Sequence, residues 1–163
     1  MTSRRHNHCR KYMQMKYKIP ISVLVVVYTP DQRVLLLERA DKPGFWQSVT
    51  GSQEPGESLE ETAIRELAEE TGLDAHQYDL EDWHMSNQFE IFKHWSGRYE
   101  SGTTHNTEHV FGLRVPDAVR IRVSPREHLG YEWVPRDRAI DKVFSWTNAA
   151  ALRTLPQHVA AKG

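Results

Sequence analysis

The feature that most constrains this chain is an acidic segment at residues 51–73, which predicts one helix with well-marked ends. Ser58 is a residue type preferred at helix N-caps, and Glu61 three positions later completes a capping-box pattern. Gly72 is the residue type preferred just past a helix end. The segment therefore predicts a helix from 58 to 71. Its core face should carry the apolar residues that recur at four-residue spacing, namely Leu59, Ala63 and Leu67.

The same helix also carries a group of acidic residues. Glu66, Glu69 and Glu70 stand at i, i+3 and i+4, so their side chains should share one face, and Glu57 could fold back over it. Clustered carboxylates repel one another, and a positive charge is expected among them. Arg65 supplies one, and a divalent cation that prefers oxygen ligands, Mg²⁺ or Mn²⁺, would supply more. Because Mg²⁺ typically combines a few carboxylates with substrate phosphates, the implied ligand is a polyphosphate.

Length and charge limit the other possibilities. The chain has 163 residues, enough for one domain with its own core, and a formal net charge of -1, which creates no overall attraction to nucleic acid or an anionic membrane. The single cysteine, Cys9, excludes an intrachain disulfide, which is compatible with a reducing cytoplasm. Residues 1–17 are basic and lack the apolar region of a secretory signal, so we expect a disordered leader on a cytoplasmic protein. The most apolar run, 19–28, is about half the length of a membrane-spanning helix.

Apolar runs along the rest of the chain predict a mixed sheet flanked by helices. Strands are expected at 19–28, 33–39, 45–50, 83–95, 107–115, 119–123 and 129–134, the first two forming a hairpin. The β-branched run at 19–28 should be buried on both faces. A short helical segment should start at Pro135, and a C-terminal helix should start at Thr147 and end near Pro156.

The complete acidic segment is far more specific than an acidic helix. Gly51, five residues, Glu57, seven residues and Arg65-Glu66 are followed by an aliphatic residue, any residue, Glu69-Glu70, any residue, Gly72 and an aliphatic residue. This pattern matches the Nudix box at every defined position, and the chain therefore resembles the Nudix hydrolases. The resemblance implies an α/β fold, an α/β/α sandwich with a mixed β-sheet, in a single domain at residues 18–158. It also implies hydrolysis of a nucleoside diphosphate linked to a further group, by attack of water on phosphorus.

The same resemblance implies roles for individual residues. The metal, Mg²⁺ with Mn²⁺ as the alternative, is expected at Gly51, Glu66, Glu69 and Glu70, together with Glu127 from outside the box. Arg65 and Glu57 should orient this face, and Arg65 is also a catalytic candidate. Metal ions would acidify a bound water, and a carboxylate would accept its proton. That base is either Glu69 or Glu127, and the sequence leaves the choice open.

Segments outside the box resemble the bacterial members of this family that convert 7,8-dihydroneopterin triphosphate to the monophosphate and pyrophosphate, a step in folate synthesis. These segments keep their order along the chain and lie at 20–28, 45–52, 89–92, 106–108, 127–129 and 145–148. By matched position, the expected substrate contacts are Lys18, Arg39, Thr50 and Ser145. The two basic residues can pair with phosphate, and the two hydroxyls can bind phosphate, the polyol chain or the pterin edge. One departure is His105, which stands where arginine is expected.

Aromatic residues in or near these segments are candidates for a wall against the pterin ring. They are Trp46, Phe89, Phe92 and Trp146.

Three alternative functions remain open. The nearest is a Nudix pyrophosphohydrolase that acts on ordinary or oxidised nucleoside triphosphates. A second is a non-catalytic nucleotide sensor, which the complete set of box glutamates disfavours. A third is a nucleic-acid-binding protein, which the near-neutral charge and the lack of an interleaved basic and aromatic motif disfavour. The expected partner is a small-molecule triphosphate, and the oligomeric state is left open.

Overall fold

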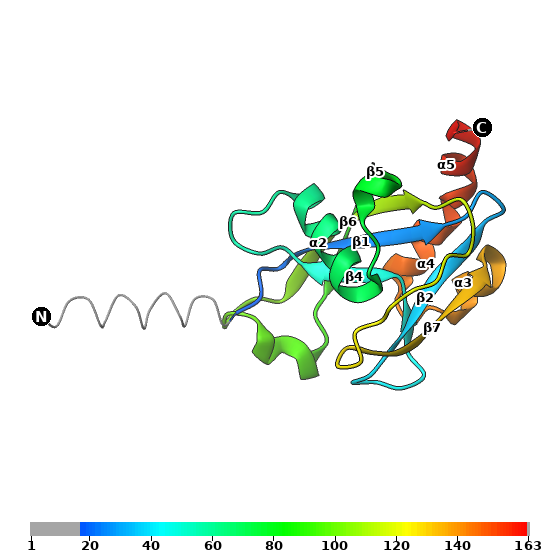
Figure 1. The fold of residues 1–163 in the computed structure, drawn as a ribbon. Helices are drawn as coiled ribbons and strands as arrows, with labels where there is room; N and C mark the ends of the chain where they lie inside the picture. Colours follow the sequence, from blue (N-terminus) through cyan, green and yellow to red (C-terminus); the bar gives the residue numbers. More distant parts are fainter. Residues whose placement is uncertain (1–16, 163) are drawn as a thin grey trace, which may run out of the picture.

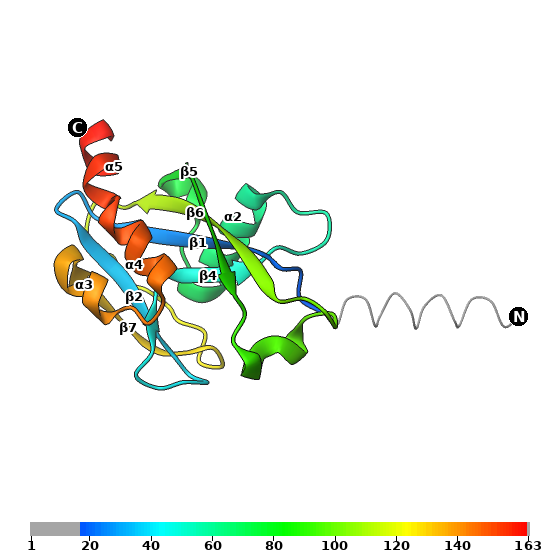
Figure 2. The same cartoon turned by 180° about the vertical axis from the view of Figure 1, so that it is seen from behind.

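One seven-stranded sheet organises the computed structural model, which describes residues 17–162 (Figures 1 and 2). The strands are β1 (Ile21–Tyr28), β2 (Arg33–Arg39), β3 (Trp46–Gln47), β4 (Val49–Ser52), β5 (Asp79–Glu90), β6 (His105–Arg114) and β7 (His128–Pro135). The main path is β3-β2-β1-β6-β5; β4 also pairs with β1, and β7 with β2. Among these seven strands, β1 and β6 pair in parallel and the other pairs are antiparallel, so the predicted mixed sheet is confirmed. The predicted leader lies outside the described residues, except for Tyr17.

Helices cover both faces of this sheet. Helix α2 (Leu59–Thr71) lies on the face toward the viewer in Figure 1. Helices α3 (Arg136–Lys142), α4 (Trp146–Arg153) and α5 (Leu155–Lys162) lie on the other face, toward the viewer in Figure 2. This arrangement is the α/β/α sandwich expected from the sequence. Within residues 17–162, no helix combines the length and the apolar character needed to cross a membrane.

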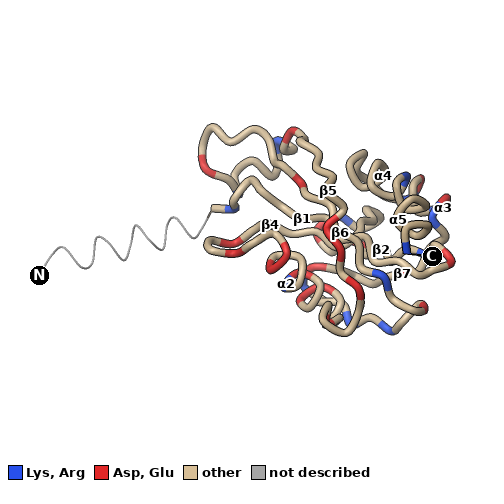
Figure 3. Tube along the Cα trace, turned by 90° about the horizontal axis from the view of Figure 1, so that it is seen from above, with Lys and Arg blue, Asp and Glu red and all other residues tan. Residues whose placement is uncertain are grey.

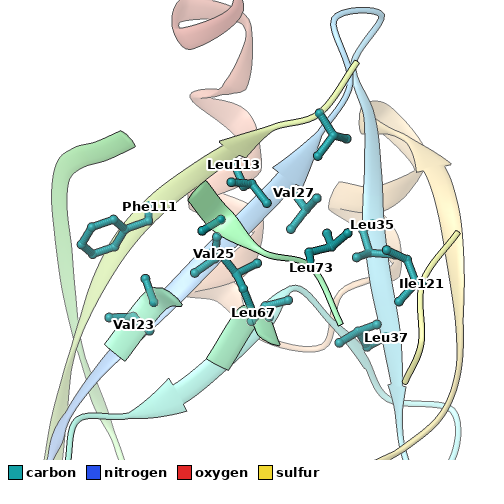
Figure 4. Close-up of a cluster of buried hydrophobic side chains, with 14 residues drawn as sticks. Val23, Val25, Val27, Leu35, Leu37, Leu67, Leu73, Phe111, Leu113 and Ile121 are labelled. Atoms are coloured by element: carbon teal, nitrogen blue, oxygen red, sulfur yellow. The ribbon is translucent and has the colours of Figure 1, made fainter. Parts of the chain in front are cut away.

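The central strand β1 contributes side chains to two hydrophobic cores, one on each face of the sheet. Its side chains alternate between the two faces, and both sets are buried. The odd-numbered residues pack with Leu67 of α2 (Figure 4), and the even-numbered residues pack under α4. The odd set is Val23, Val25 and Val27, and the even set is Leu24, Val26 and Tyr28. The predicted burial of this strand on both faces is therefore confirmed.

Helix α2 has the ends that the sequence predicts. Ser58 accepts a hydrogen bond from the Glu61 N–H, the Glu61 side chain returns to the Ser58 N–H, and Gly72 ends the helix in the left-handed region at φ 74°. Ala63 and Leu67 are fully buried, and Leu59 packs at the edge of the same core. The apolar face thus fixes the side of the sheet on which the acidic face must lie.

The predicted strand at 45–50 is divided into two strands. Its first part, β3, pairs with β2, whereas its second part, β4, pairs with β1. Buried Ser48 lies at the change of partner, where its N–H donates to Asn148 of α4 at 2.8 Å. A helix side chain therefore replaces the sheet bond at the break.

The predicted strand at 83–95 is displaced. Strand β5 begins earlier, and residues Lys93–Arg98 form the 3₁₀ helix η2. The register with β6 shifts between Asp82 and Met85, where His84 adopts φ 52°. This bulge lets the strand continue into a segment whose apolar pattern is irregular.

One further expectation about secondary structure is wrong. Residues 119–123 are not a strand, because the Arg122 N–H donates to the Thr71 carbonyl at the end of α2 while Ile121 packs on the core as irregular chain. The helix predicted to start at Thr147 and end near Pro156 corresponds to α4, which ends at Arg153; the additional helix α5 starts at Leu155 and holds Pro156 in its first turn, where no N–H is needed. The hairpin at 19–39 forms only next to its turn, with Tyr28 paired to Val34.

Candidate active site

The acidic face of α2 lies against the end of β4. Glu66 and Glu70 are buried, whereas the Glu69 side chain is 52% exposed. Gly51 of β4 lies so close to Glu66 that a Cβ at this position would overlap the Glu66 carboxyl group. The box glycine is therefore required for close approach of the strand to the helix. Figure 3 shows acidic residues along α2 and in the loop that precedes it.

Glu127, an acidic residue from outside the box, lies close to Glu70. Ligand atoms of Glu70, Glu127 and His128 lie within 4.8 Å of one another. One Glu70 oxygen accepts a hydrogen bond from the Thr50 N–H at 3.1 Å, and the other lies 3.8 Å from His128 Nε2. The structure thus brings Glu127, which precedes β7 in the sequence, to the acidic face of α2.

Arg65 forms ion pairs with several of the acidic residues. Its guanidinium lies 2.7 Å from Glu57, 2.8 Å from Glu66 and 3.3 Å from Glu69. It also donates to the Ser52 carbonyl of β4 at 3.0 Å. Arg65 thereby links the loop before α2, the helix and the strand, and the orienting role of Arg65 and Glu57 stays a prediction.

One arginine does not neutralise the group. Burial raises the pKa of Glu66 to about 7, against the opposing effect of Arg65. Burial, followed by the charges of Glu66 and Glu127, raises the pKa of Glu70 well above its ordinary value. Two buried carboxyl groups thus share one spot with an exposed third, and the negative potential there suits a divalent cation. The oxygen-rich donor set fits Mg²⁺ or Mn²⁺.

His128 is a part of this site that sequence reasoning missed. Its side chain is 3% exposed, and its Nδ1 has no hydrogen-bond partner within residues 17–162. Burial and nearby Arg39 lower the pKa of His128 to about 4, so its ring is neutral at pH 7. A histidine beside a glutamate carries no periodicity signal, and its place next to Glu70 arises only when β7 pairs with β2.

The two basic candidates lie at the border of the acidic group. Lys18 is anchored by its N–H, which donates to the Arg98 carbonyl at 2.9 Å. Its pKa is lowered by partial desolvation and by Arg98, while Glu66 and Glu127 act in the opposite direction. Lys18 therefore lies within electrostatic range of both carboxylates.

The other basic candidate, Arg39, is held on several sides. It donates to Asp41 at 2.7 Å and to Gln47 at 3.0 Å, and its guanidinium lies 4.8 Å from the ring centre of Trp95. Trp95 of η2 was not singled out from the sequence, because it lies outside the segments that carry the family resemblance. The stacking fixes the plane of the guanidinium.

The hydroxyl groups of the two remaining polar candidates already form hydrogen bonds within the protein. Thr50 donates its hydroxyl to the Val23 carbonyl at 2.9 Å, and Ser145 caps α4 by accepting from the Asn148 N–H at 3.1 Å. Each oxygen retains the capacity to accept one more hydrogen bond. The structure does not bring Ser145 into contact with the acidic group.

The aromatic candidates differ in accessibility. Phe92 and Trp146 are more than half exposed, and Phe89 is half-buried opposite Asn106. Trp46 has Lys142 4.2 Å from its ring centre and packs on the core under α4. His105 is exposed and bonded to Thr104 at 2.8 Å. Phe89 is paired with Asn106, which lies on the α4 side of the sheet, and Trp146 is the first residue of α4.

The Glu57–Arg65 pair gives a prediction about acid stability. Hydrogen bonds from Arg65 lower the pKa of Glu57 to about 2. The folded-state pKa is depressed, so the pair stabilises the fold above the ordinary glutamate pKa and loses this effect as the pH falls toward 2. Because both groups are partly exposed, we expect about 1–2 kcal/mol at pH 7 rather than the full value of the shift.

Urea unfolding of Glu57→Gln and the parent protein at pH 7 and pH 3 would measure this effect. The difference in unfolding free energy should be larger at pH 7. Glu60→Gln, which changes an exposed acid on the same helix, is the matched control. Equal differences at both pH values would contradict the assigned role of the pair.

Comparison with known proteins gives consistent matches. The NUDIX domain family model matches residues 18–155. Dihydroneopterin triphosphate diphosphatase of Escherichia coli is 45% identical over 139 residues, covering 83% of this chain and 91% of the relative. The Haemophilus influenzae protein of the same name is 43% identical over 87% of this chain and 90% of its own length.

A solved structure and a more distant relative extend this comparison. The structure of the E. coli dihydroneopterin triphosphate pyrophosphohydrolase superposes with a TM-score of 0.80 at 45% identity, covering 85% of this chain and 95% of that chain. An E. coli CTP pyrophosphohydrolase is 29% identical, covering 80% of this chain and 95% of its own.

Proposed function

Because this chain belongs to the NUDIX domain family, we propose that it hydrolyses 7,8-dihydroneopterin triphosphate to dihydroneopterin monophosphate and pyrophosphate. The observation that carries the reaction class is the convergence of Glu70, Glu127 and Glu66 on one spot. The substrate is supported by the relatives of that name, which match most of this chain at 43% and 45% identity. The sequence resemblance places this step in folate synthesis.

The acidic group accounts for the proposed use of a divalent metal, with Mg²⁺ as the ion and Mn²⁺ as the alternative. Glu66, Glu69, Glu70 and Glu127, with the backbone of Gly51, are the proposed ligands. When bound there, the cation would draw charge from the phosphate oxygens and acidify a bound water. The cation would thereby offset the repulsion between the anionic substrate and the clustered carboxylates.

The protein's own groups supply orientation and proton transfer. Arg65 holds Glu57, Glu66 and Glu69 in place through the short contacts described above. The base that accepts the water proton is Glu127 or Glu69. The geometry favours Glu127, because the Glu69 carboxylate is already bound to Arg65, whereas Glu127 forms no ion pair with any residue from 17 to 162. Lys18 and Arg39 would bind the phosphate chain, and Thr50 and Ser145 would each accept a hydrogen bond from the substrate.

A substrate panel tests the proposal. Purified protein should be assayed for pyrophosphate release from dihydroneopterin triphosphate, dATP, dGTP and 8-oxo-dGTP at saturating Mg²⁺. We expect kcat/KM for the pterin to exceed that for each nucleotide, by about 10-fold or more for dATP, since a site that hydrogen-bonds a ring edge rejects an analogue that lacks this edge. Equal or higher kcat/KM for a nucleotide would contradict the pterin assignment.

The alternative is a pyrophosphohydrolase for ordinary or oxidised nucleoside triphosphates. The CTP pyrophosphohydrolase that matches most of this chain at 29% identity supports it. The same panel, extended to CTP, separates the two functions. We also propose a cytoplasmic location, which cell fractionation followed by immunoblotting would test.

A further inference from the structure

A group of buried polar side chains lies on the face of the sheet that α4 covers, opposite α2. Glu108 and Asn106 of β6 share this face with Val110 of the α4-side core, and they are 4% and 2% exposed. Asn87 of β5 is directly opposite Glu108 in the antiparallel pair, and Ser22 of β1 is opposite it in the parallel pair. Four polar side chains thus meet where three strands lie side by side.

Several atoms of this group have no hydrogen-bond partner. Within the described chain, Glu108 Oε1, Asn106 Oδ1 and Asn87 Nδ2 are buried and unpaired. The amide nitrogen of Asn106 does have a partner, because Nδ2 donates to Ser22 Oγ at 2.7 Å. Buried polar atoms are nearly always paired in proteins, so three unpaired atoms in one place indicate something that supplies their partners.

The position of the group connects it to the acidic site. Ser22 pairs with Glu108 on one side and with Ser52 of β4 on the other, and the Ser52 carbonyl accepts a hydrogen bond from Arg65. The polar group therefore lies at the same end of the sheet as the acidic face of α2. Exposed Trp146 begins α4 beside it, and Phe89 is opposite Asn106. A ligand could thus extend from phosphates at α2 to a ring near α4.

The unpaired atoms specify the edge of that ring. A carboxylate can accept from two parallel N–H donors, such as a ring N–H and the neighbouring exocyclic amine. An amide nitrogen such as Asn87 Nδ2 can donate to a ring carbonyl. Two donors beside a carbonyl form the 2-amino-4-oxopyrimidine edge, which dihydropterins and guanine share and which adenine and cytosine lack.

We propose that Glu108, flanked by Asn87 and Asn106, selects the substrate by binding a 2-amino-4-oxopyrimidine edge. This inference rests on the proposed function and names the part of the substrate that the α4 side of the sheet recognises. Burial raises the pKa of Glu108 to about 7, against a hydrogen bond from Thr147, and two ring donors would favour its ionised form. Glu108 is a specificity residue here and has no part in the hydrolytic step.

The test compares Glu108→Gln with the parent protein. The amide keeps the shape of the side chain but turns one acceptor into a donor, which would oppose a ring donor. We expect KM for dihydroneopterin triphosphate to rise about 10- to 100-fold, the effect of losing a hydrogen bond to a charged group, with kcat changed much less. The kcat/KM for dATP, which lacks this edge, should stay the same.

Binding gives a readout that does not depend on turnover. Neopterin, which carries the same edge and no phosphate, can be titrated into each protein and followed by its fluorescence. Its affinity should fall about 10- to 100-fold in Glu108→Gln. Glu81→Gln, at the other end of β5, is the matched control and should bind neopterin as the parent protein does. If Glu108→Gln does not fold, Asn87→Ala at a half-buried position should show a smaller loss of the same kind.

The outcomes separate the two proposals. Unchanged neopterin affinity and unchanged KM in Glu108→Gln would overturn the inference and leave the hydrolase proposal intact. A lower melting temperature with equal changes for dihydroneopterin triphosphate and dATP would show a structural role filled by ordered water, and would also overturn it. Glu108-dependent neopterin binding by a parent protein that does not hydrolyse the pterin triphosphate would support the inference and contradict the proposed function.

Discussion

Replacing Glu70 with glutamine should reduce kcat about 10²- to 10³-fold, as expected for losing a group that stabilises the reacting charge. Glu70 is buried, lies within 4.8 Å of ligand atoms of Glu127 and His128, and is fixed by the Thr50 N–H. The amide keeps the volume and loses the charge, so the proposed cation would lose a ligand while the apolar face of α2 keeps its packing. Pyrophosphate release at saturating substrate and Mg²⁺ measures the effect.

The fold should survive this substitution. Glu70 lies beside Glu66 and Glu127, whose charges disfavour its ionised form, so removing the charge relieves repulsion in the metal-free protein. Circular dichroism should show an unchanged spectrum and a melting temperature no lower than that of the parent protein. Glu60→Gln, on the exposed first turn of α2, should retain full activity as the control. Near-normal turnover by Glu70→Gln would remove Glu70 from the metal site.

Gly51→Ala is the second substitution with a large expected effect. The added Cβ would overlap the Glu66 carboxyl group, so the carboxylate or strand β4 must move. A displacement of about 1 Å in a catalytic arrangement can cost about 10²-fold in rate, and we expect a loss of that order in kcat/KM. Overpacking should also lower the unfolding free energy by about 1–3 kcal/mol.

Steady-state kinetics and urea unfolding would measure both effects. Gly130→Ala is the matched control, because a Cβ at Gly130 meets no atom within 4 Å. Its activity and stability should stay close to those of the parent protein. If Gly51→Ala behaved in the same way, the close packing of β4 on Glu66 would not be needed for activity.

The parts of the fold that were predicted correctly have local causes. The ends of α2 follow from Ser58, Glu61 and Gly72, which act within a few residues of themselves. The burial of β1 on both faces follows from its β-branched run. The errors depend on distant residues: the break at Ser48 depends on Asn148, and the irregular path at 119–123 depends on the end of α2.

The candidate site shows the same division. The spacing of Glu66, Glu69 and Glu70 was visible in the sequence, and the burial of two of them follows from the apolar face of the helix. Family resemblance selected Glu127, and the structure places it beside Glu70. The resemblance included the segments that hold Glu108 and His128 but assigned no role to either residue, and it did not include Trp95. Their neighbours are set by strand pairing and by η2, which sequence spacing does not encode.

Uptake of Mn²⁺ is the most direct test of the claim that the acidic face of α2 binds a divalent cation. Free Mn²⁺ can be followed by electron paramagnetic resonance as metal is added to the parent protein and to Glu70→Gln. The parent protein should remove at least one equivalent of Mn²⁺ from solution, Mg²⁺ should compete for it, and Glu70→Gln should bind it about 10-fold or more weakly. Equal uptake by both proteins, or none by the parent protein at saturating metal, would contradict the account.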